Sequence, residues 1–240
     1  MNSVRKCLIS VIIPVYNGQK YLVDALVGVQ RQTLPPDEII MVDDGSTDDS
    51  WNLMKSLADD KLKVLRQTHA GAAASRNLGI ENSRGELIAF LDCDDLWEPE
   101  KLELQFNFLQ QNPEVEVVST QFREFYSSDI SAAVKAQTKY KPGVLSGLSN
   151  SNIMVKRDVF IRIGLYDPRW QTGELMDWWS RAREGGILKA EIDRVLVSRR
   201  LHDNNLGRHA ARNRKDYLGI LKASIDRRRT GELARKIDEP

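Results

Sequence analysis

The sequence predicts an α/β protein whose central, mostly parallel sheet is flanked by helices. Three observations lead to this fold class. Strand-like and helix-like segments alternate between residues 8 and 91, an order that produces parallel strands joined by crossover helices. The helical segments carry apolar residues at helical spacing, whereas the strand-like segments are short apolar runs. The 240 residues, 41% of them hydrophobic, suffice for one large domain with a sizeable core.

The first half of the chain contains the clearest elements. In the first helix the apolar positions from Leu22 to Val29 follow the helical period, and Pro35-Pro36 ends it. Pro14 falls so late in the first strand that it leaves the ladder intact. Strands are expected at 8–16, 38–42, 62–65 and 87–91, and helices at 19–32, at 48–59 and after the small-residue stretch 70–74.

The fourth strand is the most informative segment. Leu87–Leu91 is a continuous apolar run, typical of a strand buried on both faces, and it leads directly into Asp92, Asp94 and Asp95. Crowded carboxylates at the edge of a core repel one another and are costly to desolvate. A divalent cation would remove that cost. Strand alternation places Asp92 and Asp94 on one face and turns Cys93 into the core.

The second half of the chain is less regular. The segment 126–143 is polar, has no period and contains a Pro-Gly turn, so we expect a loop there. Strands are expected at 115–118, 152–155 and 187–200, and helices from Pro99 to Gln111, before Gly164, at 172–184 and from 208 to about Arg229.

Polar residues follow several of the predicted strands. Because the carboxyl ends of parallel strands meet at one edge of a sheet, where ligands bind at the switch point of strand order, these side chains are expected to share a crevice. The residues are Tyr16, Asp43, Asp44, Arg76, Asp92 and Asp94.

Charge and cysteine usage limit the classes of protein. Cys7 and Cys93 are the only cysteines, which fits a reducing compartment, and the longest early apolar run is too short to span a membrane. We therefore expect a cytoplasmic protein without a signal peptide. The net charge is +1, yet Arg199–Lys236 holds twelve Arg and Lys against four Asp and Glu, which gives +8 there and −7 elsewhere. Such a tail should meet phosphate, an anionic lipid surface or the acidic body of the protein.

Five ordered motifs resemble the family 2 glycosyltransferases of the GT-A fold. The motifs are SVIIPVYN at 10–17, Gln32-Thr33, EIIMVDDGSTDDS at 38–50, SRNLGI at 75–80 and GELIAFLDCDD at 85–95. The resemblance covers about the first 110 residues closely. It implies one GT-A domain at 1–207, with a nucleotide-sugar and metal half at 1–112, an acceptor half at 113–207, and a basic helical tail at 208–240.

The resemblance also implies an activity. A sugar would pass from a nucleotide-diphospho-sugar, expected to be a UDP-sugar, to a hydroxyl of a saccharide or lipid-linked acceptor, with inversion and with Mn²⁺ or Mg²⁺. The enzyme would be non-processive and act in polysaccharide biosynthesis. Nucleic acid is not among the expected partners. We expect the basic tail either to contact the inner face of a membrane peripherally or to form the interface of a homodimer.

Site residues follow from the resemblance position by position. Asp94 is the expected metal ligand, with Asp92 towards the ribose or a water and His202 approaching the metal or the diphosphate. Asp43 would accept an N–H of the base. The remaining expected donor-site residues are the base wall Pro14 and Tyr16, Asp44 beside Asp43, and the phosphate-binding Arg76 and Arg200. Plain structural roles are open as well: an acidic turn at Asp92–Asp95 could cap the next helix, and Thr47, Asp48 and Asp49 could cap a helix after a turn at Gly45.

The segment Gly173–Trp179 departs from the family pattern. Family members commonly show Glu-Asp here, and the Asp takes the proton of the acceptor hydroxyl, but this chain has Leu175. Glu174 and Asp177 remain candidates for the base, with Glu174 preferred. Because of this departure, an alternative function stays open: a protein that binds a nucleotide sugar without transferring the sugar. A nucleotidyltransferase ranks last, since no Gly-rich, lysine-bearing loop is found near the start. His69 stands where the family usually has Asn.

Overall fold

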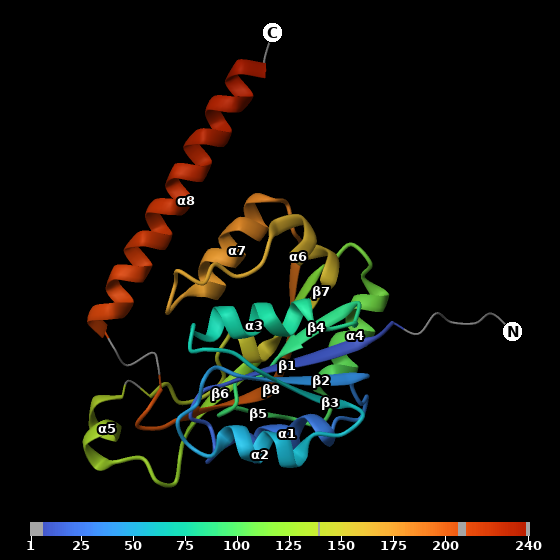
Figure 1. The fold of residues 1–240 in the computed structure, drawn as a ribbon. Coiled ribbons are helices and arrows are strands. Elements are labelled where there is room, and N and C mark those ends of the chain that lie inside the picture. The colour runs from blue at the N-terminus through green and yellow to red at the C-terminus, as the bar shows by residue number, and fades with distance from the viewer. Residues whose placement is uncertain (1–6, 139, 206–209, 239–240) are drawn as a thin grey trace, which may run out of the picture.

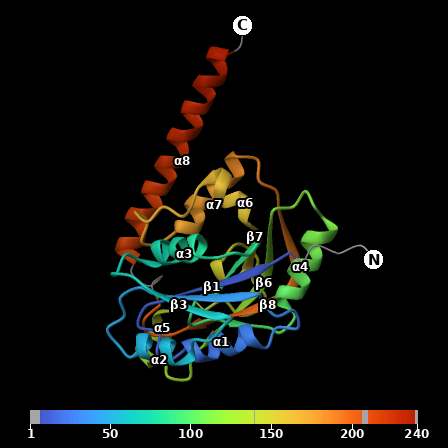
Figure 2. The ribbon, with the colours of Figure 1, turned by 45° about the vertical axis from the view of Figure 1, so that its right-hand side comes forward.

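The computed structural model describes residues 7–138, 140–205 and 210–238, the last segment with side chains at 214–230. One eight-stranded sheet, in the order β3-β2-β1-β4-β7-β6-β8-β5, runs through the domain (Figure 1). Helices cover both of its faces. In both views α3, α6 and α7 lie above the sheet and α1 and α2 below it (Figure 2).

The first four strands are parallel, as predicted. They are β1 (Ile9–Val15), β2 (Glu38–Asp43), β3 (Leu62–Arg66) and β4 (Leu87–Phe90), and the connecting helices are α1 (Leu22–Gln30), α2 (Ser50–Leu57) and α3 (Ala72–Glu81). The chain adds β2 and β3 on one side of β1 and then returns to place β4 on the other. The strand order therefore reverses between β1 and β4, which makes a crevice at their carboxyl ends.

Strand β4 is buried on both faces, as the apolar run predicted. Ile88 and Phe90 belong to the core beneath α3, α6 and α7, whereas Leu87, Ala89 and Leu91 belong to the core on the side of α1, α2 and α4. Strand alternation thus divides five consecutive apolar residues between two cores. Cys93 packs against the second of these, as expected.

The second half of the chain completes the same sheet. β7 (Ile153–Lys156) is antiparallel to β4 and to β6 (Val117–Tyr126), and β6 is parallel to β8 (Lys189–Leu201). The other elements are β5 (Leu96–Trp97), α4 (Lys101–Gln111), the 3₁₀ turn η1 (Asn150–Asn152), α6 (Arg157–Ile163) and α7 (Glu174–Glu184). The α/β fold class, with a mostly parallel sheet flanked by helices, is confirmed.

Three local expectations were wrong or incomplete. The expected loop at 126–143 contains α5 (Ala132–Gln137), whose first turn is capped by the Ser131 hydroxyl accepting from the Val134 N–H. None of its residues is buried, so it carries no apolar period. β6 continues to Tyr126 because its half-exposed second part pairs with β8. The two-residue β5 is too short to leave a pattern.

Helix α8 (Ala210–Asp238) extends past the predicted end near Arg229. It packs against α7 and then projects away from the domain (Figure 1). Residues 208, 209, 239 and 240 of the expected tail lie outside the described residues. Within the part of the chain that the structure describes, no helix is both long enough and apolar enough to cross a membrane.

Helix α4 carries one fully buried lysine, Lys101. The side chain of Lys101 is fully buried, its Nζ lies 3.9 Å from the centroid of the Trp97 ring, and it donates to Gln105 Oε1 at 2.8 Å. Burial lowers the pKa of Lys101 well below its usual value. The folded protein therefore holds the amine in an environment that favours its neutral form.

This burial predicts a pH dependence of stability. Between the lowered folded pKa of Lys101 and its ordinary unfolded value, the unfolded chain binds the extra proton, so stability rises with pH by about 1.4 kcal/mol per pH unit. Urea unfolding of wild type and Lys101→Met from pH 7 to about 10 should show that the free energy of unfolding of wild type increases with pH relative to that of the variant. The exposed Lys61→Met serves as control. A constant difference between wild type and Lys101→Met would contradict the prediction.

Candidate active site

The loops that follow β1, β2 and β4 meet at the β1–β4 switch point. Asn17, after β1, has a positive φ of 50°, and its Oδ1 accepts the Thr47 N–H at 2.8 Å. Gly18 lies so close to Cys93 that an added Cβ would come within 2.8 Å of its sulfur. The loops after β1 and β2 are thus joined, and the first of them is held against the Asp92–Asp95 segment.

Asp95 braces the Asp92–Asp95 segment from below. Its carboxylate accepts the Ser151 hydroxyl at 2.7 Å and the Arg200 N–H at 3.0 Å, while the Ser151 oxygen accepts the Asp92 N–H at 3.1 Å. Burial, followed by the charges of Asp94 and Asp92, raises the pKa of Asp95 well above its usual value. Asp95 therefore supports the segment, and Asp92 and Asp94 are left to face the crevice.

Asp94 and His202, both expected near a metal, lie within hydrogen-bond distance of each other. His202 Nε2 lies 2.8 Å from Asp94 Oδ2, and the Asn205 amide donates to the same oxygen at 3.3 Å. Two ligands bound side by side to an ion at 2.0–2.1 Å would lie about 3 Å apart. A carboxylate and an imidazole at this separation fit Mn²⁺ or Mg²⁺.

The protonation of His202 sets a condition on that fit. Its Nδ1 accepts the Asn204 N–H at 3.2 Å, so Nε2 carries the hydrogen and donates it to Asp94. A cation could bind Nε2 only after that proton has moved to Nδ1. Among the described residues no group of three or more His, Cys, Asp or Glu is arranged to hold a metal. The metal sites at Asp92, Asp94 and His202 stay predictions.

Arg76 links the strand end to the second half of the domain. Its guanidinium, 4% exposed, donates to Asp92 Oδ1 at 2.5 Å and to Glu174 Oε1 at 2.6 Å. Although burial opposes the charge, the two carboxylates raise the pKa of Arg76 above its usual value. The predicted phosphate-binding arginine therefore bridges the predicted ribose or metal residue and one candidate base.

The two candidate bases lie in different environments. Glu174, at the start of α7, has only 12% of its side chain exposed, and its Oε1 accepts from Arg76 and from the Asn150 amide at 3.0 Å. Among the described residues its hydrogen bonds fall on Oε1, which leaves Oε2 for a further donor. Asp177, three residues later in the same first turn, contacts neither Arg76 nor Asp92 among the described residues.

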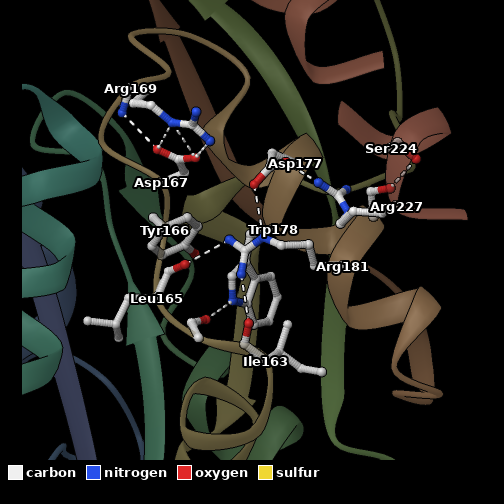
Figure 3. Close-up of polar contacts among 12 residues, drawn as sticks. Ile163, Leu165, Tyr166, Asp167, Arg169, Asp177, Trp178, Arg181, Ser224 and Arg227 are labelled. Carbon is white, nitrogen blue, oxygen red and sulfur yellow. Dashed lines mark hydrogen bonds and ion pairs between the residues drawn. The ribbon is translucent and has the colours of Figure 1, made fainter. Parts of the chain in front are cut away.

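Asp177 belongs to a structural network between α7 and α8 (Figure 3). Its Oδ2 accepts from Arg181 at 3.0 Å and its Oδ1 lies 3.3 Å from Arg227 of α8. Arg181 also donates to the carbonyls of Ile163 and Leu165, at 2.8 and 2.7 Å. Both oxygens of Asp177 are thus occupied by arginines that fix α8 and the segment after α6. The position of Asp177 therefore favours a structural role over that of a catalytic base.

Asp43 and Asp44, after β2, are both buried and differ in their partners. Asp43 Oδ2 lies 3.0 Å from Arg66 Nε but has no hydrogen-bond partner of good geometry within the described structure. Asp44 accepts the N–H groups of Ala70 and Gly71, each at 2.9 Å. Asp44 therefore shapes the loop before α3. Asp43 Oδ2 remains available as an acceptor, and it lies beneath the Arg66 side chain, which is 45% exposed.

The predicted base wall is half accessible. Tyr16 is 44% exposed and stacks on His69 with ring centroids 4.2 Å apart, while His69 Nδ1 lies 2.8 Å from Asp44 Oδ2. Pro14 is buried within β1, opposite Val42. Tyr16 and His69 thus form an aromatic pair at the rim of the crevice, above Asp43 and Asp44.

The Arg200 side chain packs against residues of the site instead of projecting into the crevice. Its Nε donates to the Asp94 carbonyl at 2.9 Å, and its guanidinium lies 4.8 Å from the Tyr21 ring and 4.9 Å from the Phe125 ring. These contacts orient the backbone of Asp94. Direct binding of phosphate by Arg200 stays a prediction.

Sequence reasoning missed several residues that hold the site together. Asn150 links Glu174 to the Tyr166 hydroxyl, which donates to Asn150 Oδ1 at 3.1 Å, and Ser151 holds the Asp92–Asp95 segment. The signal was the polar run Ser149–Asn152 directly before an apolar strand. A polar run in that position is buried only when its side chains have partners.

The family model for "Glycosyl transferase family 2" matches residues 10–164, which is more than half of the chain. The chain belongs to glycosyl transferase family 2. An uncharacterized glycosyltransferase of Rickettsia conorii is 39% identical over 146 residues, or 60% of this chain and 22% of the relative. Glycosyltransferase GlyG of Streptococcus pneumoniae is 37% identical over 125 residues, or 51% of this chain and 41% of the relative.

Solved structures share the fold. TarS of S. aureus, residues 1–349 in complex with UDP-GlcNAc, aligns with a TM-score of 0.67 at 18% identity over 82% of this chain and 60% of that one. The predicted family and the GT-A fold are thereby confirmed. The chain spans only about a fifth of the length of three Rickettsia relatives that it matches.

The network around Asp177 generates a stability prediction. Asp177→Asn removes a buried charge from two arginines and should lower the free energy of unfolding by about 2–4 kcal/mol. Asp167→Asn removes a pair with the exposed Arg169 and should cost less than about 1 kcal/mol. Urea unfolding of both variants measures the difference. Equal losses would mean that the Asp177 network is not structural.

Proposed function

We propose that this family 2 chain is a glycosyltransferase that moves a sugar from a UDP-sugar to an acceptor hydroxyl, with inversion and without processive repetition. The observation that carries the proposal is the convergence at the β1–β4 switch point. There the Asp94–His202 pair lies beside the Asp92–Arg76–Glu174 chain of contacts. Oxygen ligands, a guanidinium and a carboxylate in one crevice are the groups that this reaction needs.

The donor side of the proposal rests on the loops after β1 and β2. A nucleobase would stack against Tyr16 and His69, and Asp43 would accept its N–H with the oxygen that lacks a partner. The base could reach this oxygen only if the Arg66 side chain moved aside. The likeness to TarS with bound UDP-GlcNAc supports a UDP-sugar as donor.

A divalent cation would be held by Asp94, with Asp92 and His202 beside it. When bound, Mn²⁺ or Mg²⁺ neutralises the charge that grows on the leaving diphosphate. The chain's own part is to keep the carboxylates in place. Asp95 and Ser151 fix the backbone of the segment, and Arg200 holds the Asp94 carbonyl. Arg76 adds a fixed positive charge beside Asp92, where a phosphate oxygen could accept from it.

Glu174 is the proposed base. Its Oε2 could take the proton of an acceptor hydroxyl while Oε1 stays bound to Arg76 and Asn150, which hold the carboxylate in one orientation. The acceptor is proposed to be a saccharide or a lipid-linked hydroxyl.

A second function is favoured by Leu175. This residue, in the position where the family commonly has Asp, is 8% exposed and packs in the core beneath α3, α6 and α7. A protein that binds a nucleotide sugar without transferring it would tolerate such a residue. The two functions share the donor site and differ only in whether Glu174 acts as a base.

The metal site is tested by binding. Isothermal titration of wild type with UDP and Mn²⁺ should show binding that falls at least tenfold when EDTA replaces the metal. Asp94→Asn should show the same loss in the presence of Mn²⁺, while the exposed control Asp60→Asn keeps full affinity. Metal-independent UDP binding in both wild type and Asp94→Asn would reject the metal site.

The base is tested by turnover. Glu174→Gln should lower the rate of sugar transfer, or of donor hydrolysis, by about 10²-fold or more and leave UDP affinity within about threefold. Asp177→Asn should keep turnover per folded molecule. A panel of nucleotide sugars with Mn²⁺, screened first by thermal shift, selects the donor. If wild type binds the donor and never turns it over with any acceptor or water, the binding function is correct.

A further inference from the structure

One side of helix α8 is fully used by contacts with the domain. Asp216 Oδ2 accepts the Gln171 and Thr172 N–H groups, each at 3.1 Å, and Ile220 is 2% exposed. Arg227 donates to Glu184 at 2.9 Å. Ser224, between Ile220 and Arg227, donates to Glu184 at 3.0 Å. The four inward contacts thus recur every three or four residues, so they fix the rotation of the helix as well as its position.

The opposite side of α8 carries an apolar stripe in solvent. Leu218, Leu221 and Ile225, at i, i+3 and i+7, are 62, 54 and 37% exposed. Because the inner side is tied to α7, the helix cannot turn this stripe into the domain core. Figure 1 shows the rest of the 29-residue helix projecting away from the domain. We call these three residues and the cations beside them the outer face.

The outer face is strongly cationic. Helical spacing places five exposed cations around the stripe, and Asp226 is the one exposed carboxylate among the described side chains of the helix. The cations are Arg214, Lys215, Lys222, Arg228 and Arg229. Long basic side chains beside a narrow apolar stripe characterise helices that lie in the plane of an anionic membrane surface.

We infer that the outer face of α8 binds an anionic lipid surface, with Leu218, Leu221 and Ile225 inserted between headgroups and the flanking cations on lipid phosphates. Charge complementarity selects this occupant. A second copy packed on the same stripe would bring two sets of like charges together in a poorly hydrated interface. A lipid surface instead supplies anions to every cation while covering the apolar side chains.

The contacts that anchor α8 connect the proposed lipid-binding face to the start of α7. Asp216 holds the segment directly before Glu174, and a Cβ on Gly173 would come within 2.9 Å of Ile220. Bound lipid would therefore lie on a helix that is rigidly joined to the start of α7. The inference itself concerns α8 alone and holds whether or not sugar is transferred.

Vesicle sedimentation of the full chain tests the inference. With vesicles of phosphatidylcholine containing about one-third phosphatidylglycerol, the bound fraction should exceed that with phosphatidylcholine alone by roughly tenfold, and about 0.5 M NaCl should reverse it. Two variants should each lose this binding: the apolar triple Leu218→Gln, Leu221→Gln and Ile225→Gln, and the charge triple Lys215→Gln, Lys222→Gln and Arg229→Gln.

Matched controls separate the outer face from general properties of the protein. Ile161→Gln with Leu188→Gln removes exposed apolar residues elsewhere, and Lys55→Gln with Lys61→Gln and Lys63→Gln removes an equal positive charge. Both should bind vesicles as wild type does. Thermal melts confirm that every variant is folded. Vesicle binding that survives both outer-face triples overturns the inference, and so does a dimer, seen by light scattering, that the apolar triple dissolves.

Discussion

The site depends above all on one buried guanidinium. Arg76 comes from α3, yet its two ion pairs are made with Asp92 at the end of β4 and Glu174 at the start of α7. A buried charge is tolerated only with such partners, and loss of either carboxylate would leave the guanidinium with a single counter-charge. The same cation thus joins the two halves of the domain and sets the distance between the proposed donor and acceptor groups.

Much of this arrangement was predictable from the sequence, and the reason is physical. The strands β1, β2 and β4 are mostly apolar, and the polar residues that follow them must meet wherever parallel strands end. The pairing of Arg76 with Glu174 was not predictable. These residues are 98 positions apart, and no local pattern records which of several carboxylates a buried arginine selects. The same holds for Asn150 and Ser151, whose burial follows from their partners.

The choice between Glu174 and Asp177 shows where local reasoning stops. Both lie in the first turn of α7, and a helix gives them similar positions. They differ in their partners from other helices: Arg227 of α8 contacts Asp177, whereas Arg76 of α3 contacts Glu174. An acid enclosed by two arginines at a helix junction stabilises the junction, and an acid with one oxygen left for a substrate is suited to proton transfer. The difference lies in tertiary contacts that a sequence pattern does not encode.

The basic tail illustrates how one charge pattern can serve two purposes. The sequence offered the acidic body of the protein or an external anion as its partner, and the described part of α8 divides its charges between inner and outer sides. Arg227 faces inward and pairs with Glu184 and Asp177, so part of the tail charge neutralises the domain. The cations at Lys215, Lys222 and Arg229 are exposed. Because the inward contacts fix the helix rotation, the outward cations stay on one side, and their field adds up there instead of averaging around the helix.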